Sequence, residues 1–399
     1  MPTNHAMAAD AEAAEQEAGH AAHDALAPVF AQYPLEVARA EGVWLLSPGG
    51  RRVLDLYGGH AVAALGYGHP AWTRALSEQA RAVNFQSNAI PMDVRTRAAN
   101  KLIAFSRLPV ESVFFINSGA EANENALKMA FTLNPGRTEV VALEHSFHGR
   151  TAAAGALTWG AAKKWYGFPR TPFDVKFLPR RDVAALAQIT EKTAAVVVEP
   201  VQGVGGAFDL GAIYLEAVRK RCDETGTVLI FDEVQCGMGR VGYPFSANMY
   251  GVVPDMITTA KALGNGFPCG ALLMMKKAAD AVRLDALGTT FGGGPMACAA
   301  IEACIDAIER EDLLANVQRV SNYIRKHCIV GPVTGHQGAG FLTGLITNIP
   351  AKAVQEALLD QDILAGTSGD PNVLRLLPAF ILKEAEVDLL VAALKRISP

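Results

Sequence analysis

The middle of the chain alternates short apolar runs with longer stretches of helical period. The apolar runs are Ser112–Ile116, Val140–Leu143, Ala195–Val198, Val228–Phe231, Met256–Thr259 and Ala271–Met275. Between several of them, apolar residues recur every three or four positions, as in Glu121–Phe131 and Ile213–Glu224. This alternation predicts βαβ units, and therefore an α/β fold whose mostly parallel sheet is covered by helices on both faces.

From Pro295 onward the pattern changes. Three stretches of helical period dominate, with short strands between them: Ala297–Arg310, Leu313–His327 and Lys383–Ile397. We expect a separate, smaller α+β domain at residues 295–399.

The N-terminal part falls into two pieces. Residues 1–27 are Ala-rich and have no apolar stripe that would dock a helix, so they are predicted to be a disordered tail. Val43–Leu46 and Arg52–Leu56 flank a Pro-Gly-Gly turn and predict a β-hairpin. We expect residues 28–58 to join the small domain and residues 59–294 to form the large one.

Composition and charge exclude several classes of protein. Half of the residues are hydrophobic and 19% are charged, which is typical of a packed enzyme and not of a disordered chain. The 36 basic and 40 acidic residues nearly cancel, so a nucleic-acid partner is not expected. No apolar run approaches the roughly 20 residues of a membrane span.

The cysteines and the N-terminal residues favour a cytoplasmic protein. The six cysteines form no CxxC pair, so we expect reduced, buried thiols and neither disulfides nor a zinc site. No signal peptide is visible, and the early acids Asp10, Glu12, Glu15 and Glu17 argue against a mitochondrial presequence.

Polar residues that follow the apolar runs are expected to converge, because ligands of a parallel sheet bind beyond the carboxyl ends of its strands. Ser118-Gly119-Ala120 comes between a strand and a helix, where free amides at a positive helix end suit a phosphate. By itself this turn is more often an ordinary N-cap than a phosphate site. Asp232 closes the run Val228–Phe231, where a carboxylate can be a simple turn residue or can meet a cofactor.

Lys261 follows another buried run and precedes a glycine-rich turn. A lysine there either reaches solvent along its own stem or is held as an amine that can form a Schiff base with a carbonyl cofactor. The three elements together match the needs of pyridoxal 5'-phosphate. They provide a phosphate anchor, a carboxylate that keeps the pyridine nitrogen protonated, and a lysine amine that can also move a proton.

The chain resembles the class III, fold-type I aminotransferases, and within them the N-acylornithine branch of acetylornithine and succinylornithine aminotransferases. The resemblance runs from about Tyr33 to the C-terminus. Its motifs are Leu65-Gly66-Tyr67-Gly68-His69-Pro70, Asn117-Ser118-Gly119-Ala120-Glu121-Ala122-Asn123-Glu124, Phe231-Asp232-Glu233-Val234-Gln235, Lys261 with Gly264 and Gly266-Phe267-Pro268, and Gly288-Thr289-Thr290-Phe291-Gly292-Gly293.

The resemblance implies a role for further residues in cofactor binding. Gly119 and Ala120 would hold the phosphate, Phe147 would stack on the pyridine ring, and Gln235 would reach the ring hydroxyl. Thr289 and Thr290 would contact the phosphate in the neighbouring subunit. A homodimer with active sites at the subunit interface is therefore expected.

Two arginines suit carboxylate binding, Arg150 and Arg375. From the residues alone, each is as well explained by a structural ion pair as by a substrate contact. The resemblance assigns Arg150 to the α-carboxylate of an acylornithine and Arg375 to that of glutamate or 2-oxoglutarate. Glu199, after Val196–Val198, would line the same pocket.

One position departs from the family pattern. Many relatives have a glutamate where this chain has Val204, and that glutamate pairs with the second arginine when the distal-amine substrate binds. Our hypothesis is that its absence shifts the acyl preference towards a charged succinyl group. Elsewhere we expect hydrogen-bonding histidines and no metal at His60, His69, His145 and His148, and a packed pair of Trp159 and Trp165.

The expected function is a PLP-dependent aminotransferase of arginine metabolism. It would move the distal amine of N-acetylornithine or N-succinylornithine to 2-oxoglutarate, giving the semialdehyde and glutamate. The alternatives are another ω-amine substrate, such as ornithine, 4-aminobutyrate or a lysine-pathway amine, and a non-catalytic PLP-binding regulatory protein.

Overall fold

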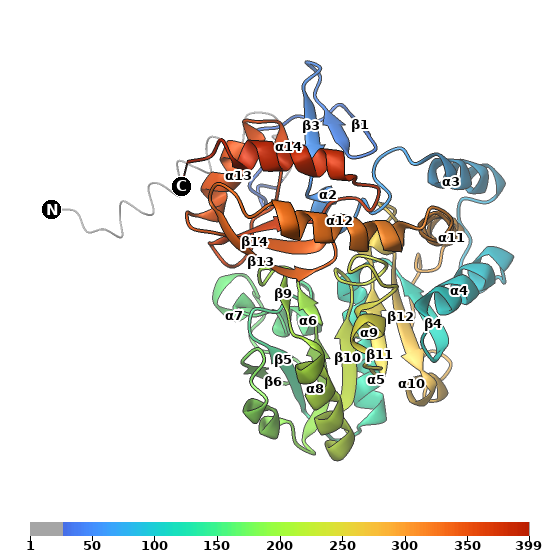
Figure 1. The fold of residues 1–399 in the computed structure, drawn as a ribbon. Coiled ribbons are helices and arrows are strands. Elements are labelled where there is room, and N and C mark those ends of the chain that lie inside the picture. The colour runs from blue at the N-terminus through green and yellow to red at the C-terminus, as the bar shows by residue number, and fades with distance from the viewer. Residues whose placement is uncertain (1–26, 399) are drawn as a thin grey trace.

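A seven-stranded sheet forms the centre of the computed structural model, which describes residues 27–398 (Figure 1). The tail predicted at residues 1–27 lies outside the described residues except for Ala27. The sheet order is β4-β12-β11-β10-β7-β5-β6. Its strands are β4 (Val110–Ile116), β5 (Glu139–Leu143), β6 (Asp174–Leu178), β7 (Thr193–Val198), β10 (Val228–Asp232), β11 (Met256–Thr259) and β12 (Gly270–Met275).

The strand directions confirm the predicted mixed, mostly parallel sheet. Strand β10 is parallel to β7 and β11, and β5 is parallel to β6 and β7. Only β12 runs against its neighbours β11 and β4. All six predicted strands are present, while the edge strand β6 was not predicted because its residues are only partly buried.

Helices cover both faces of the sheet, as the unbroken apolar runs of β7 and β10 predict. Alternate strand residues point to opposite faces. Val197 and Ile230 pack in one core cluster with α5 (Gly119–Leu133), whereas Val196 and Phe231 pack in the other with α8 (Ala212–Thr225). The two central strands are therefore shielded from water on both sides.

Further helices and short strands surround the sheet. They are α3 (Pro70–Ala82), α4 (Asp93–Ser106), α6 (Ala152–Ala156), α7 (Ala161–Lys164), η1 (Ala184–Gln188), β8 (Val201–Gln202), β9 (Phe208–Asp209), α9 (Ser246–Tyr250), η2 (Lys261–Leu263) and α10 (Lys276–Asp280). The predicted hairpin is formed by β2 (Trp44–Leu46) and β3 (Arg52–Asp55), with β1 (Arg39–Glu41) beside β2. The segment α2 (Gly58–Ala61) follows the hairpin.

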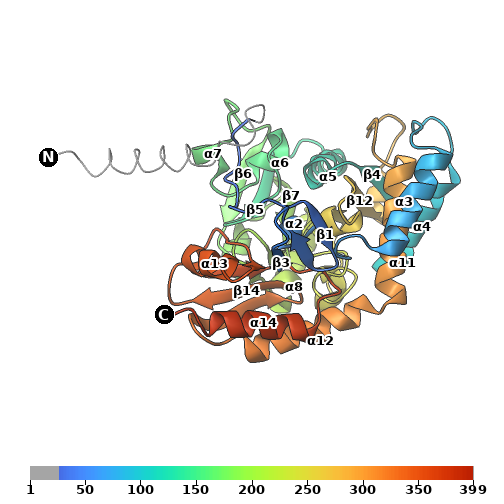
Figure 2. The ribbon, with the colours of Figure 1, turned by 90° about the horizontal axis from the view of Figure 1, so that it is seen from above.

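The two ends of the described chain meet above the large sheet (Figures 1 and 2). Strand β15 (Ile363–Leu364) pairs with β3, which joins the C-terminal part to the N-terminal hairpin. A second small sheet contains β13 (Val333–Ala339), β14 (Leu342–Thr347) and β16 (Val373–Leu376). The helices here are α11 (Pro295–Arg310), α12 (Leu313–His327), α13 (Ala351–Leu359) and α14 (Glu384–Leu394).

Two further expectations concern the described residues. All six cysteines are buried free thiols, as predicted. Across residues 27–398, every helix is too short or too polar to traverse a lipid bilayer.

Candidate active site

Strand register brings the predicted acidic residues to one edge of the sheet. Phe231 of β10 pairs with Val198 of β7, so the next residues, Asp232 and Glu199, leave neighbouring strands side by side. Asp232 itself pairs with Thr258 of β11, three residues before Lys261. The carboxyl ends of three parallel strands therefore deliver Glu199, Asp232 and Lys261 to the same region, as the sequence predicts.

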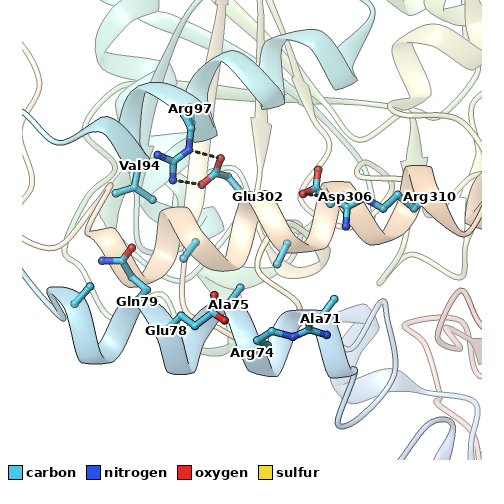
Figure 3. A pocket seen from close by; sticks show the side chains of 13 residues that line it. Ala71, Arg74, Ala75, Glu78, Gln79, Val94, Arg97, Glu302, Asp306 and Arg310 are labelled. Atoms are coloured by element: carbon cyan, nitrogen blue, oxygen red, sulfur yellow. Dashed lines mark hydrogen bonds and ion pairs between the residues drawn. The ribbon is translucent and has the colours of Figure 1, made fainter.

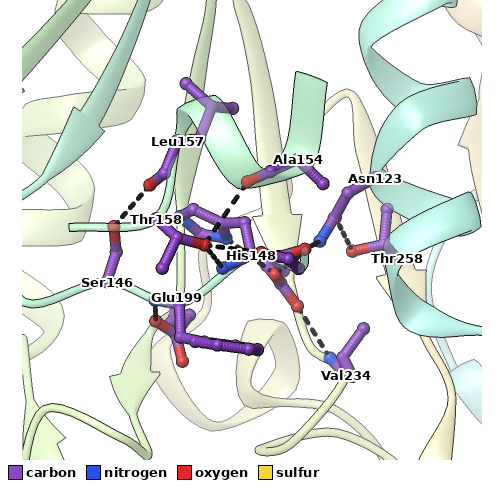
Figure 4. A network of polar contacts seen from close by, with 12 residues as sticks. Asn123, Ser146, His148, Ala154, Leu157, Thr158, Glu199, Val234 and Thr258 are labelled. Carbon is purple, nitrogen blue, oxygen red and sulfur yellow. Dashed lines mark hydrogen bonds and ion pairs between the residues drawn. The ribbon is translucent and has the colours of Figure 1, made fainter. Parts of the chain in front are cut away.

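Asp232 belongs to a buried hydrogen-bond network. Figure 4 shows three of its members, Asn123, His148 and Thr258. The Asp232 Oδ2 lies 2.7 Å from His148 Nδ1 and accepts a 2.8 Å bond from Asn123 Nδ2 of α5. The Asn123 Oδ1 in turn accepts a bond from Thr258 Oγ1 at 2.7 Å, and Asp232 Oδ1 accepts one from the Val234 amide. Each of these contacts restrains the carboxylate, which is 3% exposed.

Burial and charge act against each other in this network. Burial alone would lower the pKa of His148, but the hydrogen bond and the charge of Asp232 outweigh it and raise that pKa. The His148–Asp232 contact is thus an ion pair when the imidazole is protonated. Burial raises the pKa of Glu199 to about 7, and the Asp232 charge adds to this while His148 opposes it.

Glu199 also supports the two segments that flank it. Its Oε1 accepts a 2.8 Å bond from the amide of Phe147, and its Oε2 accepts one from the Gly203 amide at 3.3 Å. The Phe147 side chain is partly buried. The structure therefore places Phe147 beside the strand ends but shows no partner for its ring among the described residues.

Lys261 lies two residues after the end of β11, at the start of η2. Its backbone is left-handed, with φ of 49°, and its side chain is partly buried. Across residues 27–398 its amine has no hydrogen-bond or ion-pair partner. Burial, opposed by the charges of Asp232 and Glu199, lowers the pKa of its amine. A strained backbone is common at functional sites, and an unpaired amine of lowered pKa is typical of a nucleophile or a proton carrier.

The predicted phosphate cradle lies at the start of α5. Ser118 is the N-cap, and its Oγ accepts a 3.1 Å bond from the Glu121 amide. The amides of Gly119 and Ala120 have no acceptor among the described residues. A Cβ at position 119 would lie 2.7 Å from Val234 Cγ1, so glycine is required by close packing. The helix start is both capped and free to bind an anion.

Gln235 has a buried acceptor without a donor. Its Oε1 finds no hydrogen-bond partner in the described part of the chain. The backbone of Gly203 approaches it so closely that a Cβ there would lie 1.5 Å from the same atom. Because an unpaired buried acceptor is costly, this oxygen is suited to a hydroxyl donor of a bound ligand.

Arg375 is a buried guanidinium without a carboxylate partner. It is 6% exposed, its Nε donates to the Thr367 carbonyl at 2.6 Å, and its Nη1 has no partner among residues 27–398. Burial lowers its pKa, opposed by Tyr57, Tyr33 and Glu199. A buried guanidinium with an unused N–H donor has the chemistry to pair with an anion.

Arg150 lies in a different environment. It is exposed, and its Cζ is 4.9 Å from the ring centre of Trp165. The predicted pair of Trp159 and Trp165 is wrong, because Trp159 packs on His145 and Phe177 with ring centres 5.8 and 5.1 Å away. The short helix α7 lies between the two tryptophans in the chain, and Trp165 contacts Arg150 instead of Trp159.

The two predicted threonines differ in their surroundings. Thr289 Oγ1 accepts bonds from Asn117 Nδ2 and the Gly292 amide, both at 3.1 Å, and therefore lies near the start of α5 in its own chain. Thr290 is exposed, and the following Phe291 is 65% exposed. This loop therefore exposes a hydroxyl group, that of Thr290, next to an aromatic ring, that of Phe291.

Sequence reasoning missed some contacts and anticipated others. The side-chain amide of Asn123 joins Asp232 to Thr258, a contact that the motif around Asn123 does not predict. The expected hydrogen-bonding histidines are found at His148, at His60 with Tyr57 Oη at 2.6 Å, and at His69 with Glu311 at 2.9 Å. His145 differs by packing its ring on Trp159. Among the described residues no cluster of metal ligands occurs.

A groove elsewhere contains none of the predicted site residues. It has a volume of about 490 Å³ and lies between α3, α4 and α11 (Figure 3). Its charged lining residues partly neutralise one another, as in the pairing of Arg97 with Glu302 at 3.1 Å. The chemistry-bearing residues are at the strand ends and not in this groove.

Comparisons with known proteins agree with this geometry. Residues 26–398 match the family model "Aminotransferase class-III". The chain is 38% identical to the mitochondrial acetylornithine aminotransferase of Alnus glutinosa, over 94% of this chain and 85% of that protein. It is 37% identical to a succinylornithine transaminase/acetylornithine aminotransferase of Pseudomonas aeruginosa, over 91% and 92%. The crystal structure of ornithine aminotransferase from Toxoplasma gondii has the same fold, with a TM-score of 0.89, 24% identity and coverage of 99% and 98%.

Proposed function

This chain belongs to the class III aminotransferases, and we propose that it moves the distal amino group of N-acetylornithine or N-succinylornithine to 2-oxoglutarate. The products are the corresponding semialdehyde and glutamate. As an aminotransferase it takes a small-molecule amino donor and a keto-acid acceptor. The relatives at 37–38% identity carry the N-acylornithine names that support the finer assignment.

The enzymes of this class depend on pyridoxal 5'-phosphate, which supplies an electron sink for removal of a proton next to the transferred amine. The residues present fit this group. The free amides of Gly119 and Ala120 suit its phosphate, the buried Asp232 suits a protonated ring nitrogen, and the unpaired Gln235 Oε1 suits its hydroxyl.

Each site residue has a role in the proposal. Lys261 would supply the amine that holds the cofactor's carbonyl group and would be the base that moves the proton. Asp232 would keep the ring nitrogen protonated, and Phe147 would lie against the ring. Ser118 completes the phosphate site. Glu199 lines the pocket and fixes the amides of Phe147 and Gly203.

The observation that carries the proposal is the unpaired Nη1 of buried Arg375, whose charge also acts on Lys261. A carboxylate bound there places an amino acid or keto acid within reach of the reactive amine. Arg375 therefore takes the α-carboxylate of glutamate or 2-oxoglutarate. The exposed Arg150 takes the α-carboxylate of the acylated donor, whose amine is at the far end of its chain.

The absence of an acid at position 204 supports a preference for the succinyl donor. No carboxylate pairs with Arg375 among residues 27–398. Its positive charge therefore stays available in both half-reactions, and a succinyl carboxylate would use it where an acetyl group would not. Comparison of kcat/KM for the two donors tests this preference, and a strong preference for the acetyl compound would refute it.

The assembly and domain division belong to the same proposal. Residues 59–294 form the large cofactor domain, and residues 28–58 and 295–399 form the small one. A homodimer places Thr289 and Thr290 at the phosphate of the neighbouring subunit, which the exposed Thr290 and Phe291 favour. The six free thiols favour a cytoplasmic location.

A panel of amino donors tests the function. The purified, cofactor-loaded protein is mixed with N-acetylornithine, N-succinylornithine, ornithine or 4-aminobutyrate, and loss of the cofactor's visible absorbance is followed. Glutamate serves as the common reference donor. Rapid bleaching by an N-acylornithine supports the proposal. Bleaching only by free ornithine or 4-aminobutyrate transfers the function to another ω-amine, and no bleaching by any donor indicates a non-catalytic protein.

A further inference from the structure

Four successive residues of α2 have left-handed backbones. The φ angles of Gly58, Gly59, His60 and Ala61 are 56°, 55°, 64° and 69°. Glycine adopts this conformation freely, but a residue with a Cβ does so at a cost in free energy. His60 and Ala61 are therefore strained, and such strain persists where the surroundings impose it, often at functional sites.

Contacts from distant parts of the chain impose this turn. Asp55 Oδ1 accepts bonds from the amides of Tyr57 and Gly58 at 2.8 and 2.9 Å. The buried Arg240 donates to the Ala61 carbonyl at 3.2 Å. A Cβ at position 58 would lie 2.7 Å from the carbonyl oxygen of Leu377, two residues after Arg375. The turn therefore packs closely against the segment that contains Arg375.

The turn holds an imidazole that shares one neighbour, Tyr57, with that arginine. His60 and Gly59 are exposed, whereas Gly58 and Ala61 at the two ends of the turn are buried. Its Nδ1 lies 2.6 Å from the Tyr57 hydroxyl, and the Arg375 Cζ is 6.0 Å from the centre of the Tyr57 ring. Tyr57 therefore lies against both side chains and links them.

The surroundings favour a neutral imidazole. Desolvation lowers the pKa of His60, and the positive charges of Arg375 and Lys261 lower it further. Burial raises the pKa of Tyr57, so its hydroxyl remains a donor. With Nδ1 accepting the Tyr57 hydrogen, the ring proton is on Nε2, which becomes a free hydrogen-bond donor.

We propose that His60 is a specificity-determining residue that donates a hydrogen bond from Nε2 to the carboxylate bound by Arg375. Tyr57 acts as a positioning residue, because it fixes the ring and its tautomer. This inference rests on the proposed function, which gives Arg375 the carboxylate of the acceptor. A simpler role, in which His60 only supports the turn through Tyr57, makes different predictions.

Glutarate is a suitable probe, because this dicarboxylate has neither an amine nor a keto group to react. Its Kd is measured on the cofactor-loaded protein by calorimetry. His60→Gly removes the donor and also suits the left-handed backbone, so folding is preserved. His60→Asn tolerates the same backbone and retains an N–H donor. His336→Gly removes an exposed histidine of β13 and is the control.

We expect His60→Gly to raise the Kd of glutarate about tenfold, as loss of a hydrogen bond to a charged group does. His60→Asn should recover part of this loss, Tyr57→Phe should weaken binding less than His60→Gly, and His336→Gly should leave it unchanged. A purely structural role would lower the thermal stability of the Tyr57→Phe and His60→Asn variants but leave the Kd of glutarate unchanged.

A Kd within twofold of wild type in His60→Gly would overturn the proposal. If glutarate fails to bind the wild-type protein, both this inference and the role of Arg375 are refuted. If the donor panel refutes an N-acylornithine substrate while glutarate binding still depends on His60, only the donor assignment fails. The two proposals therefore fail by different measurements.

Discussion

The imidazole of His148 and the carboxylate of Asp232 lie 2.7 Å apart, and their side chains are 0% and 3% exposed. An ion pair that is shut off from water keeps its charges in place, because no solvent competes for them. His148 Nε2 is itself buried without a partner among the described residues. Asn123 and the Val234 amide thus hold the carboxylate from the protein side, and His148 Nε2 keeps an unused hydrogen-bonding position.

Removing either member of this pair should impair turnover to different degrees. Asp232→Asn keeps the shape but loses the charge, and we expect kcat to fall by about 10³-fold or more. In His148→Asn the carboxylate keeps its bond from Asn123, so a fall of only about 10- to 100-fold is expected. Steady-state kinetics at saturating cofactor measure both, and equal losses would contradict this ranking.

Lys261→Ala should abolish turnover without unfolding the protein. We expect kcat to fall by at least about 10³-fold, since the variant lacks the proton carrier. The cofactor-free variant should be as stable as wild type or more stable, because a desolvated amine has been removed. Lys277→Ala changes an exposed lysine and is the control. Turnover close to that of wild type in Lys261→Ala would refute the assignment.

The two arginines should affect opposite half-reactions. Arg375→Gln should raise KM for 2-oxoglutarate by about 10²-fold, because a buried charged contact is lost. Arg150→Gln should raise KM for the N-acylornithine by about tenfold. The effect is smaller because Arg150 is exposed, so water and salt screen its attraction for the α-carboxylate of the donor.

Single-turnover bleaching separates these effects. Arg375→Gln should react nearly normally with the acylated donor, whereas Arg150→Gln should react nearly normally with glutamate. A variant that loses both half-reactions equally would show that its arginine supports the site as a whole and does not select a substrate.

Glu199 should make stability depend on pH. Its folded pKa of about 7 lies above the ordinary value of 4.5, so the folded protein retains a proton that the unfolded chain releases. The contribution of Glu199 to stability is therefore most favourable below about pH 4.5, falls between about pH 4.5 and pH 7, and stays lower above it. Glu199→Gln removes this dependence and should gain up to about 3 kcal/mol over wild type at pH 8. Urea unfolding of the cofactor-free proteins at pH 5 and pH 8 measures it, and the same difference at both pH values would contradict it.

Gly203→Ala should weaken cofactor binding more than folding. The new methyl group would displace the Gln235 side chain, whose Oε1 would be 1.5 Å away, and a side-chain end can move. We expect the Kd for pyridoxal 5'-phosphate to rise about tenfold, as expected for one lost hydrogen bond.

A second glycine provides the contrast. In Gly270→Ala the new Cβ would lie 2.7 Å from the backbone oxygen of Ser118, which cannot move so easily. That variant should lose about 1–3 kcal/mol of folding stability. Thermal unfolding and fluorescence titration with the cofactor distinguish the two, and a large loss of stability in Gly203→Ala would contradict the prediction.

The sequence by itself determined six of the seven strands of the large sheet and, to within one residue, the positions of their carboxyl ends. Unbroken apolar runs such as Ala195–Val198 and Val228–Phe231 mark strands buried on both faces, and the residue after each run must lie at the sheet edge. The N-cap of Ser118 was predictable for the same reason, since it depends on residues within one turn.

Only the tertiary structure decided which distant groups meet. The reversed direction of β12, the pairing of β3 with β15, and the Asn123 bridge between Asp232 and Thr258 join residues far apart in the chain. Among residues 27–398, the absence of a carboxylate bonded to Arg375 and the contact of both His60 and Arg375 with Tyr57 likewise depend on packing. Local pattern records whether a residue is buried, whereas contacts between segments are fixed by register and packing, which no short stretch of sequence contains.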